Sequence, residues 1–439
     1  IVNIKRLSST LAEKGHQIHL LSYSMDGSQL NELSKFANSF GIKLSLMPNC
    51  LKLTEERIEW ILNTLAKDRP DIFVPNSFVC GFYAAKWIRK AGIPTIGYFR
   101  SNDQFHEDLV NEFVMKQDEF SVSAMICVAK TFKDRLDKSS LPKTRSYFLP
   151  SGVPVPSQNS SQLNENSIGA CYIGRFEEHQ KNFRETTLAL LRNLEKKVIS
   201  RAGFIGDGTQ RGWLLDEISN RNLNHLATWH GAVAQEFLNH TLQSYQVSVL
   251  LSDFEGTPGA VMDAMANGLV PVVTNIPDGT TELVEHEVSG LVVSNRRDDF
   301  DDALSRLSND SNLRKKLAKN AKKKISEEYS LEKMGCDFEV ICIELLKETD
   351  SSQKEILIPR KINLPPVKGS LAREDRRRFK NKLLQSNTDF LNPKLSKRSI
   401  DTFWIRTQIK ESLSKNLNSL NGKLLDVGAG DQPYKDFII

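Results

Sequence analysis

The sequence is poor in the features that mark several special classes of protein. Six cysteines occur in 439 residues and none forms a Cys-x-x-Cys pair, which argues against a disulfide scaffold and against zinc-ligand spacing. No run of about 18 apolar residues occurs, so no transmembrane helix is expected. No signal peptide is visible, and the first residue is Ile, as if the chain were trimmed. We therefore expect a cytoplasmic protein whose thiols are free and mostly buried.

The charge balance excludes few classes of protein, but it indicates which kinds of partner the protein can bind. The net charge is +5, which does not demand nucleic acid. It suits an acidic substrate, or peripheral contact with an anionic membrane. Hydrophobic residues make up 39% and charged residues 26%, as in globular proteins with packed cores. The length allows two or three domains of about 100–200 residues each.

Strand and helix signals alternate over the first 150 residues. This alternation predicts an α/β fold with a parallel, doubly wound sheet, on which ligands bind beyond the carboxyl ends of the strands. The predicted strands cover 17–22, 43–47, 71–75, 94–99 and 121–128, and the predicted helices cover 1–15, 56–67, 78–90 and 130–139.

A polar loop follows the apolar strand predicted at 94–99. Arg100, Asp103 and His106 are its titratable side chains, and the loop lies at a strand end where ligands bind. We regard Asp103 as a candidate catalytic residue, and Arg100 and His106 as candidates for contact with a substrate. An ordinary surface loop is the alternative, above all for His106.

The most informative stretch is 247–274. An apolar run at 247–251 predicts a buried strand, and 269–274 predicts the next one. Between them Pro258 suits the first turn of a helix, and Gly268 suits the position that ends one. The free backbone amides at this helix start, those of Thr257, Gly259 and Ala260, would point toward a bound anion.

Two carboxylates flank this helix start. Glu255 precedes it, and Asp263 lies in its second turn inside an apolar run. Together with the amides they indicate a ligand that carries both phosphate and hydroxyl groups. The alternative is a helix start with two solvated acids.

This stretch resembles the acidic signature of retaining glycosyltransferases of family 4, which have two Rossmann-like domains in the GT-B fold. The signature is a Glu, then Gly-x-Pro, then a second acid eight positions after the first. Here these are Glu255, Gly256 to Pro258, and Asp263, where the family usually has Glu. The resemblance implies that Glu255 and the Gly256–Pro258 turn face the donor sugar and diphosphate. It implies that Asp263 faces the ribose hydroxyls.

Further motifs occur in the order of the family between 170 and 293. Arg175 and Lys181 match a Gly-Arg…Lys motif, which implies two cations that stabilise the departing diphosphate without a metal. A surface charge pair is the alternative. Gly206 and Gly208 predict a turn that lets a backbone approach a ligand. The alternative is a turn without a role in binding. The resemblance places His230 near the donor's base, where it is a structural or peripheral residue rather than a catalyst.

The two ends of the sequence are less regular. The resemblance implies a strand and a glycine-rich loop before the helix at 1–15, and neither is present. Residues 348–400 are interpreted as a linker. In 401–439 an apolar run ends in Asp426-x-Gly428-x-Gly430, which resembles the first motif of Rossmann-like S-adenosylmethionine methyltransferases. It is interpreted as the start of a truncated third domain, or as a chance glycine turn.

Taken together, the sequence predicts an acceptor domain at 1–150 and a donor domain at 151–347 closed by helices at 312–328 and 331–347. The predicted function is retaining transfer from a nucleotide-diphosphate sugar to a glycan or lipid-linked acceptor, in cell-surface polysaccharide synthesis. One alternative is a sugar-nucleotide epimerase or hydrolase that acts on the donor alone. Another is a non-catalytic nucleotide-sugar-binding module. S-adenosylmethionine is expected as a cofactor only if the C-terminal domain is complete.

Overall fold

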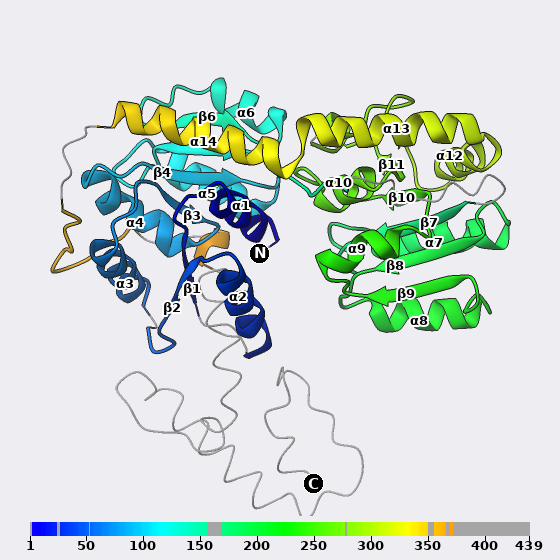
Figure 1. Cartoon of the computed structure of the whole chain (residues 1–439), viewed down its shortest axis with the longest axis horizontal. Coiled ribbons are helices and arrows are strands. Elements are labelled where there is room, and N and C mark those ends of the chain that lie inside the picture. Colours follow the sequence, from blue (N-terminus) through cyan, green and yellow to red (C-terminus); the bar gives the residue numbers. More distant parts are fainter. Residues whose placement is uncertain are drawn as a thin grey trace, which may run out of the picture. The chain divides into compact units, whose positions relative to one another are not determined.

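The computed structural model describes residues 2–23, 27–51, 53–156, 168–276, 279–349, 355–365 and 369–372 (Figure 1). The chain divides into two compact units, Ile1–Leu364 and Pro365–Ile439, and every element below belongs to the first. The methyltransferase-like motif at 426–430 and the predicted third segment lie outside the described residues. Among the described helices, none is both long and apolar enough to cross a membrane.

The second half of the unit is built on a six-stranded parallel sheet. Its strand order is β12-β11-β10-β7-β8-β9. The chain builds outward from β7 in one direction and from β10 in the other. The order therefore reverses between these two strands, and such a switch point is where doubly wound sheets bind ligands. The strands are β7 Gly169–Ile173, β8 Arg201–Ile205, β9 Ala227–Gly231, β10 Val247–Leu250, β11 Val270–Thr274 and β12 Leu291–Val293.

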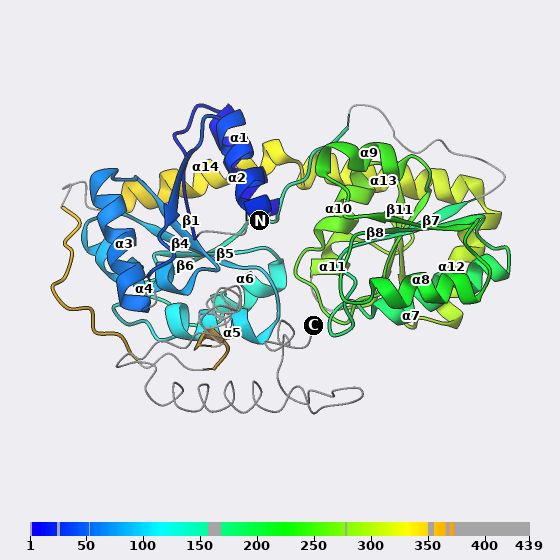
Figure 2. The same ribbon diagram turned by 90° about the horizontal axis from the view of Figure 1, so that it is seen from below.

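Helices cover both faces of this sheet (Figure 2). One face carries α7 Phe183–Glu195, α8 Arg211–Asn220 and α12 Asp298–Asn309. The other carries α9 Gln235–Leu242, α10 Gly259–Ala266 and α13 Ser311–Glu328. The short α11, Gly279–Leu283, follows β11. Because both faces are covered, β10 and β11 are buried along their whole length, which explains why their sequences are mostly apolar.

The first half holds two parallel sheets among the described residues. Strands β3 Phe73–Asn76, β4 Thr95–Phe99, β5 Ala124–Cys127 and β6 Arg145–Phe148 pair in chain order, while β1 His19–Tyr23 and β2 Lys43–Met47 pair with each other. The helices are α1 Val2–Glu13, α2 Gly27–Ser39, α3 Thr54–Lys67, α4 Val79–Lys90, α5 Gln104–Val110 and α6 Lys130–Asp137, with a π-helical turn at Asn111–Met115.

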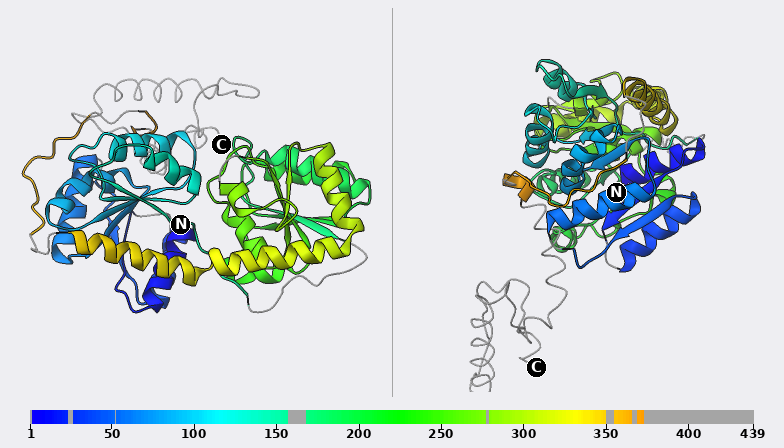
Figure 3. Two further views of the ribbon diagram at one scale, coloured as in Figure 1. Left: turned by 90° about the horizontal axis from the view of Figure 1, so that it is seen from above. Right: turned by 90° about the vertical axis from the view of Figure 1, so that its left-hand side faces the viewer.

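The last long helix returns to the first half of the chain. Helix α14, Leu331–Glu348, follows α13 nearly end to end (Figure 3). It packs against α1, where a Cβ on Gly335 would lie 2.7 Å from Thr10 Cγ2, and Glu339 pairs with Lys14 at 2.9 Å. This crossing back agrees with the closing helices that the resemblance implies.

The predicted elements are present, with ends that agree within about three residues. Strands β6 and β9 and helices α2, α5, α7 to α9, α11 and α12 have no counterpart among the predictions. His230, expected in a loop, lies inside β9. Of the six free cysteines three are buried, two are half-buried and one is exposed, so "mostly buried" holds only in part.

Candidate functional site

Two loops that follow neighbouring strands are joined at the switch point. The loop after β7 carries Arg175 and Lys181, and the loop after β10 carries Glu255. The backbone N–H of Asp253 donates to the carbonyl oxygen of Gln180 at 2.9 Å. Residues that the sequence separates by more than seventy positions therefore lie side by side at the carboxyl edge of the sheet.

A chain of polar contacts connects the three predicted residues in these loops. Lys181 Nζ lies 2.5 Å from Glu255 Oε1, and both side chains are nearly buried, at 13% and 7% exposed. Gln180 Nε2 lies 3.4 Å from Glu255 Oε2, and Arg175 Nη2 donates to Gln180 Oε1 at 3.1 Å. The bridging Gln180 was not among the predicted site residues.

The two cations differ in their surroundings. Arg175 is 64% exposed and pairs with Glu177 at 2.9 Å, so its guanidinium is held only at the surface. Lys181 is half-buried beside a carboxylate, which compensates the cost of partly removing the ammonium group from water. Lys181, held by Glu255, and Arg175, exposed at the surface, thus both lie at the carboxyl edge of the sheet.

The start of α10 lies open. Pro258 is the N-cap residue, one position before the first-turn place predicted for it, and α10 begins at Gly259. Among the described residues no acceptor is recorded for the backbone N–H groups of Gly259 and Ala260. A Cβ on Gly259 would meet nothing within 4 Å. Unpaired amides that face open space at a helix start can bind an anion.

The other predicted glycines are explained by packing inside the protein. A Cβ on Gly206, whose φ is +135°, would lie 1.9 Å from the carbonyl oxygen of Gly174. On Gly208 it would lie 2.6 Å from Phe176 O, and on Gly256 2.1 Å from Arg100 O. These positions need glycine because a neighbouring backbone approaches them, whether or not a ligand does.

The loop after β10 also contacts strand ends of the first half. Thr257 Oγ1 donates to the carbonyl oxygen of Val128, the residue after β5, at 2.5 Å. Gly256 lies against Arg100, the residue after β4. The donor-side loop and the predicted acceptor-side loop are therefore neighbours.

Arg100 has neutral partners. Its Nη2 donates to Asn76 Oδ1 at 3.2 Å, and its guanidinium carbon lies 3.9 Å from the centroid of the Tyr98 ring. None of the ion pairs found among the described residues includes Arg100. Burial lowers the pKa of Arg100, which means that its charge is incompletely compensated.

Asp103 and His106 make a local structure. Asp103 is the N-cap of α5, and its Oδ1 accepts from the backbone N–H of His106 at 2.9 Å and lies 2.8 Å from His106 Nδ1. Burial acts to raise the pKa of Asp103, but the contacts with His106 outweigh it and lower the pKa to about 2. A cap accounts for both residues, and their role toward a substrate stays a prediction.

His230 is also engaged within the protein. Its Nε2 lies 2.7 Å from the hydroxyl oxygen of Tyr245, and burial lowers the pKa of the imidazole. The neighbouring Trp229 donates its Nε1–H to the carbonyl oxygen of Gly206 at 2.9 Å. These contacts fix the turn that carries Gly206, in keeping with a structural His230.

Asp263 is buried and meets a residue from the opposite end of the sequence. It is 8% exposed, and burial raises the pKa of its carboxyl group. Arg6 Nη2 donates to Asp263 Oδ1 at 2.7 Å. Arg6 was not among the predicted site residues. No local sequence signal marks it, because Arg6 and Asp263 are 257 positions apart.

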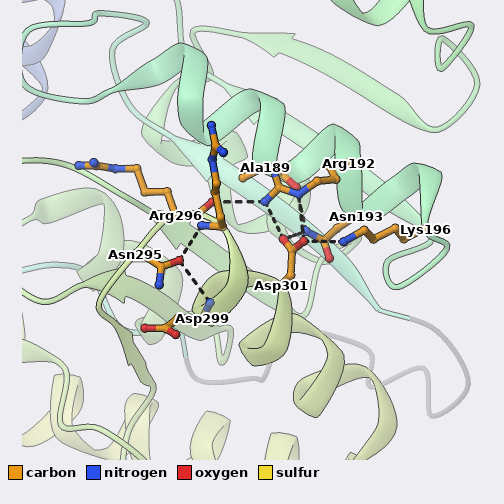
Figure 4. A network of polar contacts seen from close by, with 9 residues as sticks. Ala189, Arg192, Asn193, Lys196, Asn295, Arg296, Asp299 and Asp301 are labelled. Carbon is orange, nitrogen blue, oxygen red and sulfur yellow. Dashed lines mark hydrogen bonds and ion pairs between the residues drawn. The ribbon is translucent and has the colours of Figure 1, made fainter.

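A second cluster of charge lies at the other end of α7. Asp301 accepts from Arg192 Nη2 and Asn193 Nδ2, both at 2.7 Å, and lies 2.8 Å from Lys196 Nζ (Figure 4). Burial acts to raise the pKa of Asp301, but these donors outweigh it and lower the pKa to about 2. The cluster joins α12 to α7. Within the described residues no three His, Cys, Asp or Glu side chains are grouped so as to hold a metal ion.

Two protein families match the chain. Residues 2–155 match the family described as Glycosyltransferase Family 4, and residues 156–324 match Glycosyl transferases group 1. The second range contains Arg175, Lys181, Glu255 and Asp263.

Curated proteins of the same kind are similar over most of the described chain. An uncharacterized glycosyltransferase of Methanocaldococcus jannaschii is 21% identical over 354 residues, which are 75% of this chain and 90% of that protein. The UDP-Gal:alpha-D-GlcNAc-diphosphoundecaprenol alpha-1,3-galactosyltransferase of Escherichia coli is 26% identical over 298 residues, 61% of this chain and 74% of that protein.

Solved structures share the fold. Sucrose-phosphate synthase from Thermosynechococcus elongatus has a TM-score of 0.63 at 16% identity, over 79% of this chain and 94% of that chain. Anabaena HepE, in complex with UDP and glucose, has a TM-score of 0.61 at 14% identity, over 78% and 95%. The likeness confirms the predicted α/β fold of two Rossmann-like domains.

Proposed function

Because the chain belongs to the glycosyltransferases, with a family 4 region at 2–155 and a group 1 region at 156–324, we propose that it transfers a sugar from a nucleotide-diphosphate sugar to a hydroxyl group of a glycan or lipid-linked acceptor. The observation that carries the proposal is the chain of contacts from Lys181 through Glu255 and Gln180 to Arg175, directly before the open start of α10.

The chemistry needs positive charge at this place. In the transfer the bond between the anomeric carbon and the diphosphate oxygen breaks, and the electron pair stays on the diphosphate. The acceptor oxygen bonds to the same carbon, and its proton passes to an oxygen of the departing diphosphate. Lys181, Arg175 and the amides of Gly259 and Ala260 stabilise the charge that grows on the diphosphate. Glu255 holds Lys181 in place and faces the donor with the turn at 256–258.

Asp263 accepts from the ribose hydroxyls in this proposal, and the turn of Gly206 and Gly208 and the end of β9 at His230 border the nucleotide. Retention of the anomeric configuration is supported by the acidic signature alone. The name of one relative specifies UDP-Gal and one similar structure contains UDP, so UDP-sugars are the first donors to examine.

The acceptor side is assigned to residues 1–150. Arg100 contacts the donor-side loop and has neutral partners, which favours an acceptor with an anionic group. An acceptor of this kind is named for the Escherichia coli relative, a sugar on diphosphoundecaprenol. We propose a step in the assembly of a cell-surface glycan, carried out in the cytoplasm or at the surface of an anionic membrane.

The decisive experiment is a screen of UDP-, GDP- and ADP-sugars for thermal stabilisation of the full chain. A donor present at about 100 times its dissociation constant should stabilise the protein by about 2.7 kcal/mol. The stabilising donor is then incubated with lipid-linked and free glycans, and the product's anomeric configuration is read by NMR. Stabilisation by no sugar nucleotide would refute the proposal. Donor turnover without acceptor would favour an epimerase or hydrolase, and binding without turnover a non-catalytic module.

A further inference from the structure

Arg6 and Asp263 form a buried ion pair between the first helix of the chain and the helix that begins at the donor site. Arg6 lies in α1 and is 7% exposed, and Asp263 lies in the second turn of α10 and is 8% exposed. Arg6 Nη2 lies 2.7 Å from Asp263 Oδ1 and 2.9 Å from Oδ2. Both carboxylate oxygens therefore face one guanidinium nitrogen.

Gln235 completes the contact from a third element. Its Oε1 accepts from Arg6 Nη2 at 2.7 Å, and its Nε2 lies 3.4 Å from Asp263 Oδ1. Gln235 is the first residue of α9, in the same half of the chain as Asp263. The carboxylate is thus oriented by two donors, of which only Arg6 carries charge.

The charge of Arg6 affects the ionisation of Asp263 because both side chains are buried. Burial raises the pKa of Asp263, whereas the charge and hydrogen bond of Arg6 act against that rise. An ionised carboxylate accepts hydrogen bonds from hydroxyl groups more strongly than a protonated one does. Arg6 therefore favours the form of Asp263 that can bind a ribose.

Arg6 also keeps an unused donor. Its Nε is buried and has no hydrogen-bond partner among the described residues. A buried N–H group without an acceptor destabilises the folded protein, so such groups in a native protein call for an explanation. A ligand oxygen that reaches the Arg6–Asp263 pair would remove this cost.

We propose that Arg6 is a donor-binding residue supplied by the first half of the chain, which orients Asp263 for the ribose and donates its Nε–H to an oxygen of the same nucleoside diphosphate. The inference rests on the proposed function, in which Asp263 faces the ribose. It adds a residue from 2–155 to a site otherwise built from residues after 170, so donor binding requires both halves.

The test measures the dissociation constants of UDP, GDP and ADP for the full chain by calorimetry. The tightest of the three is then compared with its 2′-deoxy form. We expect Arg6→Ala to weaken binding of the ribonucleotide by about 10–100-fold, and Arg6→Lys by about 5-fold or more. The preference for the ribonucleotide over the 2′-deoxynucleotide should fall toward one in Arg6→Ala, because the carboxylate that reads the hydroxyl loses its orientation.

Arg192→Ala is the matched control. It removes a guanidinium–carboxylate contact of the same 2.7 Å length inside the second half, and it should lower the melting temperature but leave nucleotide affinity within about twofold. Arg6→Lys keeps a positive charge and tests the proposal if Arg6→Ala does not fold.

Three results overturn the proposal. Unchanged or tighter binding in both Arg6 variants would show that the pair is structural, or that it blocks the site. A retained ribose preference in Arg6→Ala would separate Arg6 from Asp263. If the unaltered chain binds none of the three nucleotides, the proposed function fails together with this inference. Normal binding and transfer in the Arg6 variants would refute the inference alone.

Discussion

At the scale of single residues, the proposed donor site contains a half-buried cation next to a buried carboxylate. Lys181 and Glu255 lie 2.5 Å apart and are both nearly removed from water. Such a pair contributes little to stability by itself, and breaking one partner leaves an uncompensated charge. Its position at the switch point is better explained by chemistry, because a fixed ammonium group can stabilise a leaving diphosphate without reorganising.

We expect Lys181→Ala to lower turnover of a sugar nucleotide by about 100–1000-fold, the usual cost of losing one group that stabilises developing negative charge. The rate is measured under saturating donor, with the melting temperature recorded in parallel. Lys196→Ala, which removes an exposed lysine at the end of α7, should turn over normally. A Lys181→Ala protein with near-normal turnover would exclude Lys181 from the mechanism.

At the scale of elements, Asp301 joins α12 to α7, two of the helices that cover one face of the six-stranded sheet. Three donors from α7 surround its carboxylate (Figure 4). They keep the pKa of this group at about 2, against 3.8 for an ordinary aspartate. The folded state therefore binds the proton less readily than the unfolded state does, so ionised Asp301 stabilises the fold.

This stabilisation should be present above pH 3.8 and be lost as the pH falls toward 2. Since the cluster is partly exposed to solvent, we expect a contribution of about 1–2 kcal/mol to the free energy of unfolding at pH 7. Urea unfolding from pH 7 to 2.5 should show a smaller acid-induced loss in Asp301→Asn than in the unaltered chain. The neighbouring exposed Asp302→Asn is the control. Parallel profiles for all three proteins would contradict the assignment.

At the scale of the whole first unit, polar contacts join the two halves near the site. They include the contacts of Arg6 with Asp263 and Gln235, of Thr257 with the carbonyl of Val128, and of Glu282 with the start of α6. Glu282 accepts from the backbone N–H groups of Lys130 at 2.8 Å and Thr131 at 3.0 Å. A carboxylate from α11 thus caps a helix that has no side-chain cap of its own.

We expect Glu282→Ala to destabilise the chain by about 1 kcal/mol, the usual cost of losing an N-cap. The protection of the amides of Lys130 and Thr131 from hydrogen exchange should fall as well. Glu285→Ala, which removes an exposed carboxylate two residues beyond α11, should change neither quantity. Unaltered protection at both amides in Glu282→Ala would show that the contact is not populated in solution.

Much of the fold could be predicted because its strands and helices depend on residues that are close together in the sequence. Buried parallel strands have mostly apolar sequences, as at 247–251 and 121–128. The amphipathic helices at 56–67 and 331–347 follow from the spacing of their apolar residues. Strand β6 was missed because its Arg-Ser-Tyr-Phe sequence is short and half polar. Helix α8 was missed because its apolar residues do not gather on one face.

The candidate site could be predicted only in part. Glu255, Lys181 and Arg175 were found because they belong to short motifs, and the structure connects them through Gln180, which no motif marks. Gly206 and Gly208 were predicted to let a backbone approach a ligand, or to form only a turn. The structure shows that a neighbouring backbone occupies that space.

The sequence by itself determined the alternation of strands and helices, the order of the motifs and the residues placed at strand ends, because these depend on neighbours within a few positions. Only the tertiary structure decided which side chains meet. Arg6 reaches Asp263 across 257 positions, and Glu282 reaches Lys130 across 152. Contacts at such separations arise when whole helices and strands pack together. No local sequence pattern marks the residues that make these contacts.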